Sequence, residues 1–424
     1  MKKLLLFIIG FVISQQVVFP QGCLPDGITF TTQDEVDLFQ ANHPGCTQIE
    51  GNVIISGADI TSLDGLGVLL SIRGNLEIRL NELLGDLSGL QNLETLGGDL
   101  RIEQNDVLEN LLGLENLSDI NGDLIIGDIV WGQYPYSTGN PLLTSLAGLS
   151  SLVSLQGNLK LCGNYSLVTL SGLENLASVG GNLQVGGIEF IYGFTFGNPL
   201  LVNFNGLTRL SAIGGGLFVA GNNNLTNLTG LDSLVTAGQH CWFDLNESLT
   251  TMQGLDQLTS IGGSLKIRWN NALSDISGLG HITSQSIQDL EIIYNHTLAE
   301  CNIESICGYL ADPNGTVEIY DNAPGCNSPE EVEAACDALS VSGVSRVNSL
   351  SLNPNPANDM VTISTAVSTD IARLLILTLT GQLVMELKFT GSQIRIDIGS
   401  LPPGVFIVRL QNEKSVAVTK LIRK

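Results

Sequence analysis

The sequence predicts a mainly β protein: a leucine-rich β-solenoid of about ten turns of 24 residues, followed by a small β-sandwich. Three observations predict the solenoid. A Gly-Leu pair recurs at nine positions from Gly65 to Gly278, with steps of 24, 24, 35, 24, 34, 24, 24 and 24 residues. From the second pair onward, an asparagine stands eight residues before the glycine, and a short apolar alternation follows most pairs. A fixed period near 24 residues is the signature of stacked, repeated turns.

The structure of one turn can be read from its residues. Leu100 and Ile102 alternate with charged residues, so both are expected to point inward from a short strand. Asn105 then turns the chain, and we expect its stacked copies to bond the backbone of neighbouring turns as an internal ladder. Asn295 and Asn322 continue the pattern in decayed form and predict two further, degenerate turns. The expected ladder residues are Asn81, Asn105, Asn140, Asn164, Asn198, Asn222, Asn246 and Asn270.

Residues 1–21 have the pattern of a secretory signal peptide. Lys2 and Lys3 precede an apolar run from Leu4 to Ile13, and we expect a cut near Gln21. The run is too short for a stable membrane anchor, and no other stretch of the sequence is long and apolar enough to cross a membrane. We therefore expect an exported protein with no integral membrane span after the signal is removed.

Both ends of the solenoid carry signs of caps. An open end would expose apolar side chains and unpaired strand edges. Thr32 and Glu35 begin a segment typical of a capped helix over the first turn, and residues 328–339 predict a second helix with Pro329 early in it.

Eight cysteines in an exported chain predict disulfides, and six of them flank the repeats. The four late cysteines allow three connectivities, among which we favour two bonds that clip the C-terminal cap. Cys162 and Cys241 fall at different phases of the repeat, so both are expected to be unpaired. The expected pairs are Cys23–Cys46, Cys301–Cys326 and Cys307–Cys336.

The charge is distributed unevenly along the chain. Residues 22–347 hold 8 Lys and Arg against 37 Asp and Glu, whereas residues 348–424 hold 8 against 5. An acidic body of this kind repels nucleic acid and anionic membranes, so both are excluded as expected partners.

The body resembles a known family. The run from Cys46 through Gly51 to Ile55, followed by Ile60 to Leu66, is similar to the receptor L domain, and the resemblance covers residues 23–340. It implies a right-handed leucine-rich β-solenoid, known from the ligand-binding regions of the insulin and epidermal growth factor receptors. This array is longer and lacks the cysteine-rich modules and transmembrane helix of those receptors, so hormone signalling is not implied. The resulting domain prediction is a solenoid at 22–340, a linker at 341–347 and a tail domain at 348–424.

The tail departs from the repeat and shows β alternation at residues 361–363, 374–379, 394–398 and 405–410. It resembles the type A sorting domain of the type IX secretion system. The resemblance rests on Pro354-Asn355-Pro356, on the turn at Gly381, on Leu401 to Phe406 with Gly404, and on the terminal Lys420 to Lys424. Phe406 stands where the family often has Tyr. The resemblance implies the type IX secretion machinery as a partner, passage across the outer membrane, removal of the tail, and either attachment to the cell surface or release.

Two insertions account for the long steps in the period. They span residues 128–139 and 187–197, lie between a strand and its asparagine in turns two apart, and hold seven of the 23 aromatic residues. Insertions on repeat proteins cluster on the binding face, and aromatic faces suit sugar rings or an apolar peptide patch. The alternative is that the loops pack on each other and on the solenoid. The candidate ligand-binding residues are Trp131, Tyr134, Tyr136, Phe190, Tyr192 and Phe194, with Trp242 on the strand face.

The strand face supports both interpretations. Outward positions on the middle turns form a column of small residues, namely Gly127, Cys162, Gly186 and Ala220. This column is either the floor of a shallow groove or a flat surface, called the seat below, on which the two loops pack.

The expected function is binding or adhesion at the cell surface, with an unidentified extracellular glycan or protein as ligand. We expect no catalytic residues, no metal ligands and no cofactor, because outward charges of opposite sign neutralise each other and the four histidines fall at unrelated phases of the repeat. Two alternatives remain open. One is a carbohydrate-active enzyme on a β-solenoid, and the other is a purely structural rod in the surface layer.

Overall fold

The structure, a computed structural model, describes residues 22–189, 194–339, 345–346, 350–379, 381–411 and 415–424. The chain forms two compact units, residues 1–333 and 334–424. The expected signal peptide lies outside the described residues. None of the helices in the described part of the chain has the length and apolar content of a membrane span.

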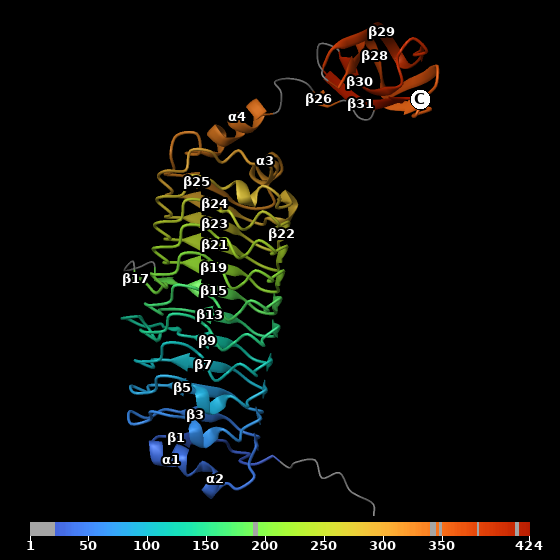
Figure 1. Cartoon of the computed structure of the whole chain (residues 1–424). Coiled ribbons are helices and arrows are strands. Elements are labelled where there is room, and N and C mark those ends of the chain that lie inside the picture. The colour runs from blue at the N-terminus through green and yellow to red at the C-terminus, as the bar shows by residue number, and fades with distance from the viewer. Residues whose placement is uncertain (1–21, 190–193, 340–344, 347–349, 380, 412–414) are drawn as a thin grey trace, which may run out of the picture. The chain divides into compact units, whose positions relative to one another are not determined.

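The first unit is a β-solenoid whose wider face is a parallel sheet (Figure 1). In the described residues this sheet has twelve strands, which correspond to the ten regular and two degenerate turns that the period predicts. Inward residues stack in register from turn to turn, as Leu100 does on Leu124. The strands are β1 (Ile28–Phe30), β3 (Val53–Ile55), β5 (Leu76–Arg79), β7 (Leu100–Glu103), β9 (Leu124–Ile126), β13 (Leu159–Leu161), β15 (Leu183–Gly186), β19 (Leu217–Ala220), β21 (Cys241–Asp244), β23 (Leu265–Arg268), β24 (Leu290–Ile293) and β25 (Val317–Tyr320).

A second, narrower parallel sheet forms another side of the solenoid. Between the two sheets the chain runs through turns and short 3₁₀ segments, η1 (Asp64–Leu66), η2 (Ser88–Leu90), η3 (Ser277–Leu279) and η4 (Ser284–Ser286). The narrow strands are β2 (Gln48–Ile49), β4 (Ser71–Ile72), β6 (Thr95–Leu96), β8 (Asp119–Ile120), β12 (Ser154–Leu155), β14 (Ser178–Val179), β18 (Ala212–Ile213), β20 (Thr236–Ala237) and β22 (Ser260–Ile261).

The recurring Gly-Leu pair is explained by a close backbone approach between turns. Gly230 has φ +110°, and a Cβ placed on it would lie 2.1 Å from the carbonyl oxygen of Phe204 in the preceding turn. Only glycine fits both the left-handed conformation and the contact. The following Leu231 is fully buried, so the pair tightens the turn and fills the core at the same step.

The asparagines form a continuous buried ladder, as the repeat phase predicts. From Asn105 onward, each side-chain oxygen accepts hydrogen bonds from the backbone N–H and the side-chain amide of the preceding rung; Asn140 accepts from Asn105 at 3.1 and 3.0 Å. Each side-chain amide also donates to a strand carbonyl, as Asn140 does to Ile102 at 2.9 Å. The ladder continues through Asn295 to Asn322, so the degenerate turns keep the same internal bonding.

A second ladder, which the sequence analysis missed, lies immediately before the wide strands. The Oδ1 of Asn75 accepts from the N–H of Asp99 at 2.8 Å, and Asp99 repeats the contact to Asp123 at 2.8 Å. His240 takes the same place, with Nδ1 accepting from Ser264 N–H at 3.0 Å. The signal was present in the sequence, because an Asn or Asp stands directly before most of these strands.

The N-terminal end is closed by α1 (Gln33–Asp37) and α2 (Phe39–Asn42) (Figure 1). Thr32 caps α1 by accepting from Glu35 N–H at 3.3 Å, which is the expected capped helix. Phe39 is buried against Phe30 of the first strand, with ring centroids 5.7 Å apart. These contacts cover the apolar end of the core.

The C-terminal end carries α3 (Glu304–Ala311), which the sequence did not predict, and α4 (Pro329–Leu339), which it did. Disulfides join Cys23 to Cys46 and Cys301 to Cys326, with Cα atoms 5.7 and 5.4 Å apart. Cys307 and Cys336 are also disulfide-bonded. Among the described cysteines, Cys162 and Cys241 are free and buried.

The tail is a small domain of mainly antiparallel strands around its own core. Its longest strand, β28, pairs with β29 on one side with shifts in register, while β27 pairs with its first part and β30 with its last part. The strands are β26 (Ser345–Arg346), β27 (Ser351–Asn353), β28 (Met360–Thr378), β29 (Leu383–Asp397), β30 (Gly404–Gln411) and β31 (Ser415–Arg423).

The start of the tail domain differs from the predicted boundary. The expected linker 341–347 contains β26, which pairs with β31, so the tail sheet begins before residue 348.

Between Pro354 and Pro356 of the sorting motif, Asn355 holds the last strand: its amide donates to the Lys420 carbonyl and its oxygen accepts from the Ile422 N–H. Gly381, in the connection between β28 and β29, and Gly404, the first residue of β30, have positive φ.

Candidate functional site

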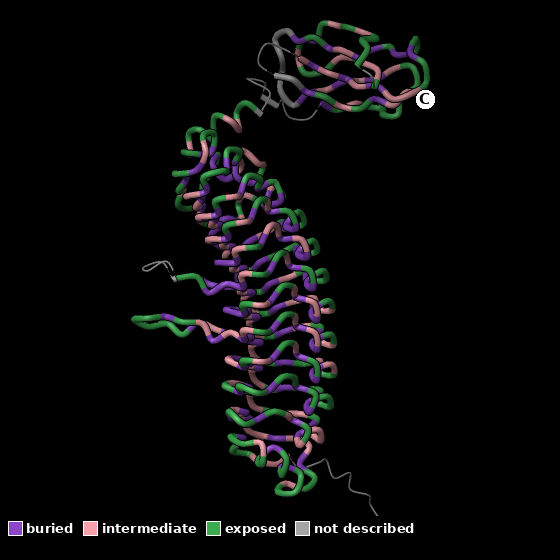
Figure 2. Tube along the Cα trace, turned by 60° about the vertical axis from the view of Figure 1, so that its left-hand side comes forward, coloured by how far each residue is buried: buried purple, intermediate pink, exposed green. Residues whose placement is uncertain are grey.

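The two insertions are short β-hairpins that project from the solenoid (Figure 2). The first pairs β10 (Ile129–Val130) with β11 (Tyr136–Ser137), and the second pairs β16 (Ile188–Glu189) with β17 (Phe194–Thr195). Both leave the wide sheet at the ends of strands β9 and β15, which are separated by β13. They return directly before the ladder residues Asn140 and Asn198, so the internal ladder is undisturbed.

The bases of the hairpins are packed onto the solenoid. Ile129 and Phe196 form a small buried cluster with the thiol of Cys162. The ring of Trp131 meets Phe196 edge to face, with centroids 6.4 Å apart. A Cβ on Gly187 would lie 2.3 Å from the end of the Ile129 side chain, so the first hairpin rests on the start of the second.

The small-residue column therefore serves both of the expected purposes. At Cys162 it is a covered seat, and burial raises the pKa of this thiol to about 12. One and two turns further on, Gly186 and Ala220 line an open pocket of about 650 Å³. Ligand sites commonly have volumes of about 300 to 1,000 Å³.

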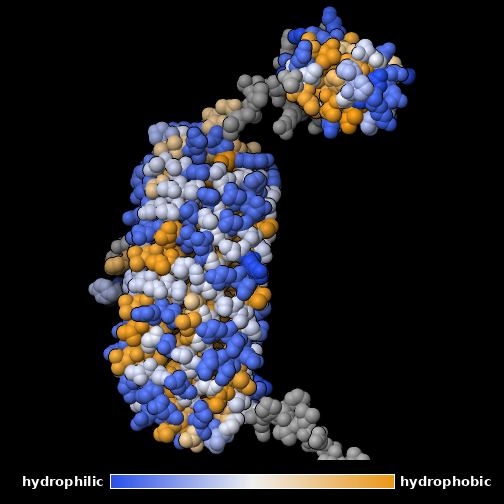
Figure 3. Space-filling model, viewed as in Figure 1, coloured by the Kyte–Doolittle hydropathy of each residue, from blue (hydrophilic) through white to orange (hydrophobic). Residues whose placement is uncertain are grey.

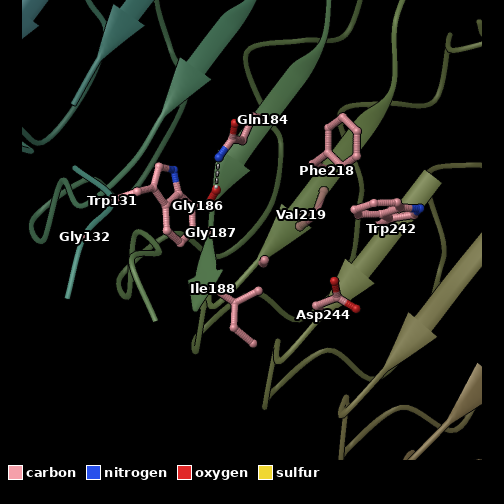
Figure 4. Close-up of a pocket in the computed structure, with 11 residues that line it drawn as sticks. Trp131, Gly132, Gln184, Gly186, Gly187, Ile188, Phe218, Val219, Trp242 and Asp244 are labelled. Carbon is pink, nitrogen blue, oxygen red and sulfur yellow. Dashed lines mark hydrogen bonds between the residues drawn. The ribbon is translucent and has the colours of Figure 1, made fainter. Parts of the chain in front are cut away.

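The pocket lies between the hairpin bases and strands β15, β19 and β21 (Figure 4). Trp131 forms one wall, Ile188 another, and Phe218 and Trp242 stand opposite. The described residues that line it are Trp131, Gly132, Gln184, Gly186, Gly187, Ile188, Phe218, Val219, Ala220, Trp242 and Asp244.

The Trp242 ring is fixed by its neighbours. Phe218 meets it edge to face with centroids 5.1 Å apart, and His240 lies against it at 5.3 Å. Lys266 places its Nζ 5.2 Å from the ring centroid, a cation–π contact, and the Arg268 guanidinium lies at 5.8 Å. This wall is consequently preformed.

The charged groups beside the pocket compensate one another. Arg268 donates to both carboxylate oxygens of Asp244, at 2.7 and 2.8 Å, in the fork geometry that favours Arg–carboxylate pairs. Glu291 binds Lys266 at 2.8 Å and Arg268 at 3.4 Å. Burial raises the pKa of Asp244 above its ordinary value, and Arg268 opposes that rise.

The structure divides the predicted binding residues. Trp131 and Trp242 line the pocket, whereas Tyr134, Tyr136 and Phe194 do not. Tyr134 is 79% exposed, because it lies in the outer part of the first hairpin. Phe190 and Tyr192 lie outside the described residues.

Of the lining residues, nine were absent from the predicted ligand-binding set, among them Gln184, Ile188, Phe218 and Asp244. Phe218 could have been found from the sequence, since it stands one period before Trp242 in the same outward column. Ile188 could not, because its position depends on how the second hairpin leaves the solenoid.

Other aromatic side chains near the C-terminal turns pack on each other. Trp269 and Tyr294 are stacked, with centroids 5.3 Å apart and an interplanar angle of 8°, and Tyr320 meets Tyr294 edge to face. Arg268 lies over Trp269 at 5.5 Å. Their faces are occupied within the protein, so they do not extend the pocket as a row of open platforms.

The outward charges on the earlier turns form ion pairs along and between turns. Arg101 binds Glu103 at 3.1 Å and Asp128 at 3.4 Å, and Asp128 also binds Lys160 at 3.1 Å. In the part of the chain that the structure describes, no three His, Cys, Asp or Glu side chains form a metal-binding group.

The space-filling view shows apolar residues gathered along the edge from which the hairpins project, with polar residues over much of the remaining surface (Figure 3). Exposed apolar side chains of the solenoid include Leu80, Leu83, Leu142 and Leu200. Leu83, Leu142 and Leu200 each stand two residues after a ladder asparagine, so they occupy corresponding places on turns that are two apart.

Comparison with known families supports the two-part architecture. Residues 351–424 match the model of the secretion system C-terminal sorting domain, and residues 45–130 match that of the receptor L domain. The same repeat continues beyond residue 130 in the structure. No curated protein matches the chain in sequence. The sorting domain, which belongs to the type IX secretion system, makes this a secreted protein or one displayed at the outer-membrane surface.

Proposed function

We propose that the protein binds an extracellular glycan or protein in the pocket between the first hairpin and β21, and that it acts as an adhesion or recognition module. The observation that carries the proposal is the open apolar pocket itself. It has aromatic walls on opposite sides, Trp131 and Trp242, and a floor cleared by Gly186 and Gly187.

Two features of the site support binding over a purely structural role. The bases of the hairpins pack onto the solenoid through Ile129 and Phe196, and Trp131 remains 60% exposed. An exported, surface-located protein also meets extracellular ligands directly. A rod that served only as a spacer would have no use for an exposed tryptophan beside a hollow.

We propose further that the site is not catalytic. Among the described residues that line the pocket, Asp244 is the one carboxylate, and both of its oxygens are held by Arg268. Acid–base hydrolysis of glycosides uses two carboxyl groups that flank the bond. Turnover in a panel of polysaccharides, with and without added divalent metal, would overturn this part of the proposal.

The binding function is tested with a glycan array and an array of extracellular proteins. Trp131→Ala is the first variant, because the side chain is exposed and its removal leaves the hairpin base in place. Trp242→Ala removes the opposite wall. We expect each to weaken binding of the same ligand about thirty-fold, the effect of losing a central aromatic anchor.

Tyr134→Ala is the matched control, since it removes an exposed aromatic side chain from the same hairpin without touching the pocket. It should leave binding unchanged. The proposal would be contradicted if a ligand bound the three variants and the unaltered protein equally. It would also be contradicted if no ligand on either array bound the protein.

A further inference from the structure

The pocket offers few free hydrogen-bonding groups to a ligand. Among the described lining residues, Gln184 and Asp244 carry an amide and a carboxylate, and the Gln184 NH2 group and both Asp244 oxygens are already hydrogen-bonded. The Gln184 amide donates to the Gly186 carbonyl at 3.1 Å, and Asp244 accepts twice from Arg268 (Figure 4 shows the first contact). A sugar ring carries several hydroxyl groups, and burying them without partners is costly.

The aromatic walls also differ from a sugar-stacking platform. Trp242 is contacted by Phe218, His240 and Lys266, so much of its ring surface is taken up within the protein. What remains facing the hollow is hydrocarbon from these rings together with Ile188. A surface of this composition is best matched by an apolar group that needs no hydrogen bonds.

The charge of the protein indicates which kind of molecule should carry the apolar group that enters the pocket. Beside the pocket, Asp244 and Glu291 are balanced by Arg268 and Lys266. The solenoid as a whole is strongly acidic, with 8 basic residues against 37 acidic ones over residues 22–347. A cationic partner is therefore attracted toward the protein without having to insert a charge into the pocket.

We propose that the pocket receives an aromatic or large aliphatic side chain from a basic segment of another protein. This assignment rests on the proposed binding function and names its ligand class. The anchor side chain fills the space between Trp131 and Trp242, and Lys or Arg residues on either side of it face the acidic surface. Burial of the anchor supplies affinity, and the flanking charges increase the rate of association.

The proposal is tested with a phage library of random peptides, selected against the purified full chain. The expected consensus is one Trp, Phe or Leu flanked by Lys or Arg. A selected peptide, labelled for fluorescence polarisation, should bind about thirty-fold more weakly to Trp131→Ala and should keep its affinity for Tyr134→Ala. Its affinity should fall as the salt concentration rises, since the flanking charges are exposed. Replacing its anchor by Ser should abolish binding.

The outcomes separate this inference from the function on which it rests. If glycans bind the unaltered protein but not Trp131→Ala, and no peptide of the expected type is selected, the ligand class is wrong and the binding function stands. Peptides that are selected but bind Trp131→Ala and Trp242→Ala normally would also overturn the assignment. If neither glycans nor peptides depend on these two residues, the binding function fails as well. Urea unfolding of each variant shows whether a loss reflects the pocket or the fold.

Discussion

Replacing one ladder asparagine tests how the solenoid is held together. Asn222 is fully buried, and its oxygen accepts from the Asn198 N–H at 2.9 Å while its amide donates to the Val185 carbonyl at 2.9 Å. Asn222→Ala leaves that N–H buried without a partner, at a cost of about 1–3 kcal/mol, and removes the bond to Val185, at about 1 kcal/mol. We expect the free energy of unfolding to fall by about 3 kcal/mol.

The assay is urea unfolding followed by tryptophan fluorescence. The three tryptophans of the chain all lie in the solenoid, at positions 131, 242 and 269, so the signal reports this unit and not the tail. Asn224→Ala is the matched control, because Asn224 is exposed two residues away and should change stability by less than about 0.5 kcal/mol. If the two variants unfold at the same urea concentration, the ladder does not stabilise the fold as argued.

Three further predictions follow from individual contacts. Burial raises the pKa of Cys162 to about 12, so this thiol should resist iodoacetamide at mildly alkaline pH. In Phe196→Ala, Cys162 should become labelled while the interior Cys241 stays protected, which peptide mass mapping distinguishes. Equal labelling of both cysteines would refute the idea that Phe196 covers Cys162. His240→Ala should cost about 1–3 kcal/mol of unfolding free energy, because Ser264 N–H loses its acceptor, and His240→Asn should restore most of it; failure of the Asn variant would mean that the ring, and not the acceptor, matters. Hydrogen bonds from the backbone N–H and side chain of Thr316 lower the pKa of Asp289, so its contribution to stability is present above the unfolded pKa near 3.9 and is lost as the pH falls through the lower folded value. Stability of Asp289→Asn should therefore depend less on pH below about 4, as measured by urea midpoints, and an unaltered acid profile would contradict this.

Part of the candidate site was predictable and part was not. The two insertions could be located from the steps of 35 and 34 residues, and Trp242 could be placed on the outward face from the strand register. The hairpin residues could not be sorted from the sequence, because Trp131, Tyr134 and Tyr136 have similar chemistry. Their roles depend on the seat of the hairpin, where Ile129 rests beside Gly187.

Sequence alone determined the solenoid. In a stacked repeat each residue meets its counterpart one period away, so a one-dimensional pattern of Leu, Gly and Asn fixes neighbours such as Asn105 and Asn140 without knowledge of the rest of the fold. The second ladder, at positions such as Asn75, was equally readable.

The tertiary structure decided where a ligand fits. The role of each residue in the small column depended on which side chains the hairpins placed over it: Phe196 packs on Cys162, whereas Ala220 lines the pocket with Trp131 and Trp242. Those contacts join residues from different turns through loops that carry no repeat. Their geometry follows from packing in three dimensions, and no period in the sequence encodes it.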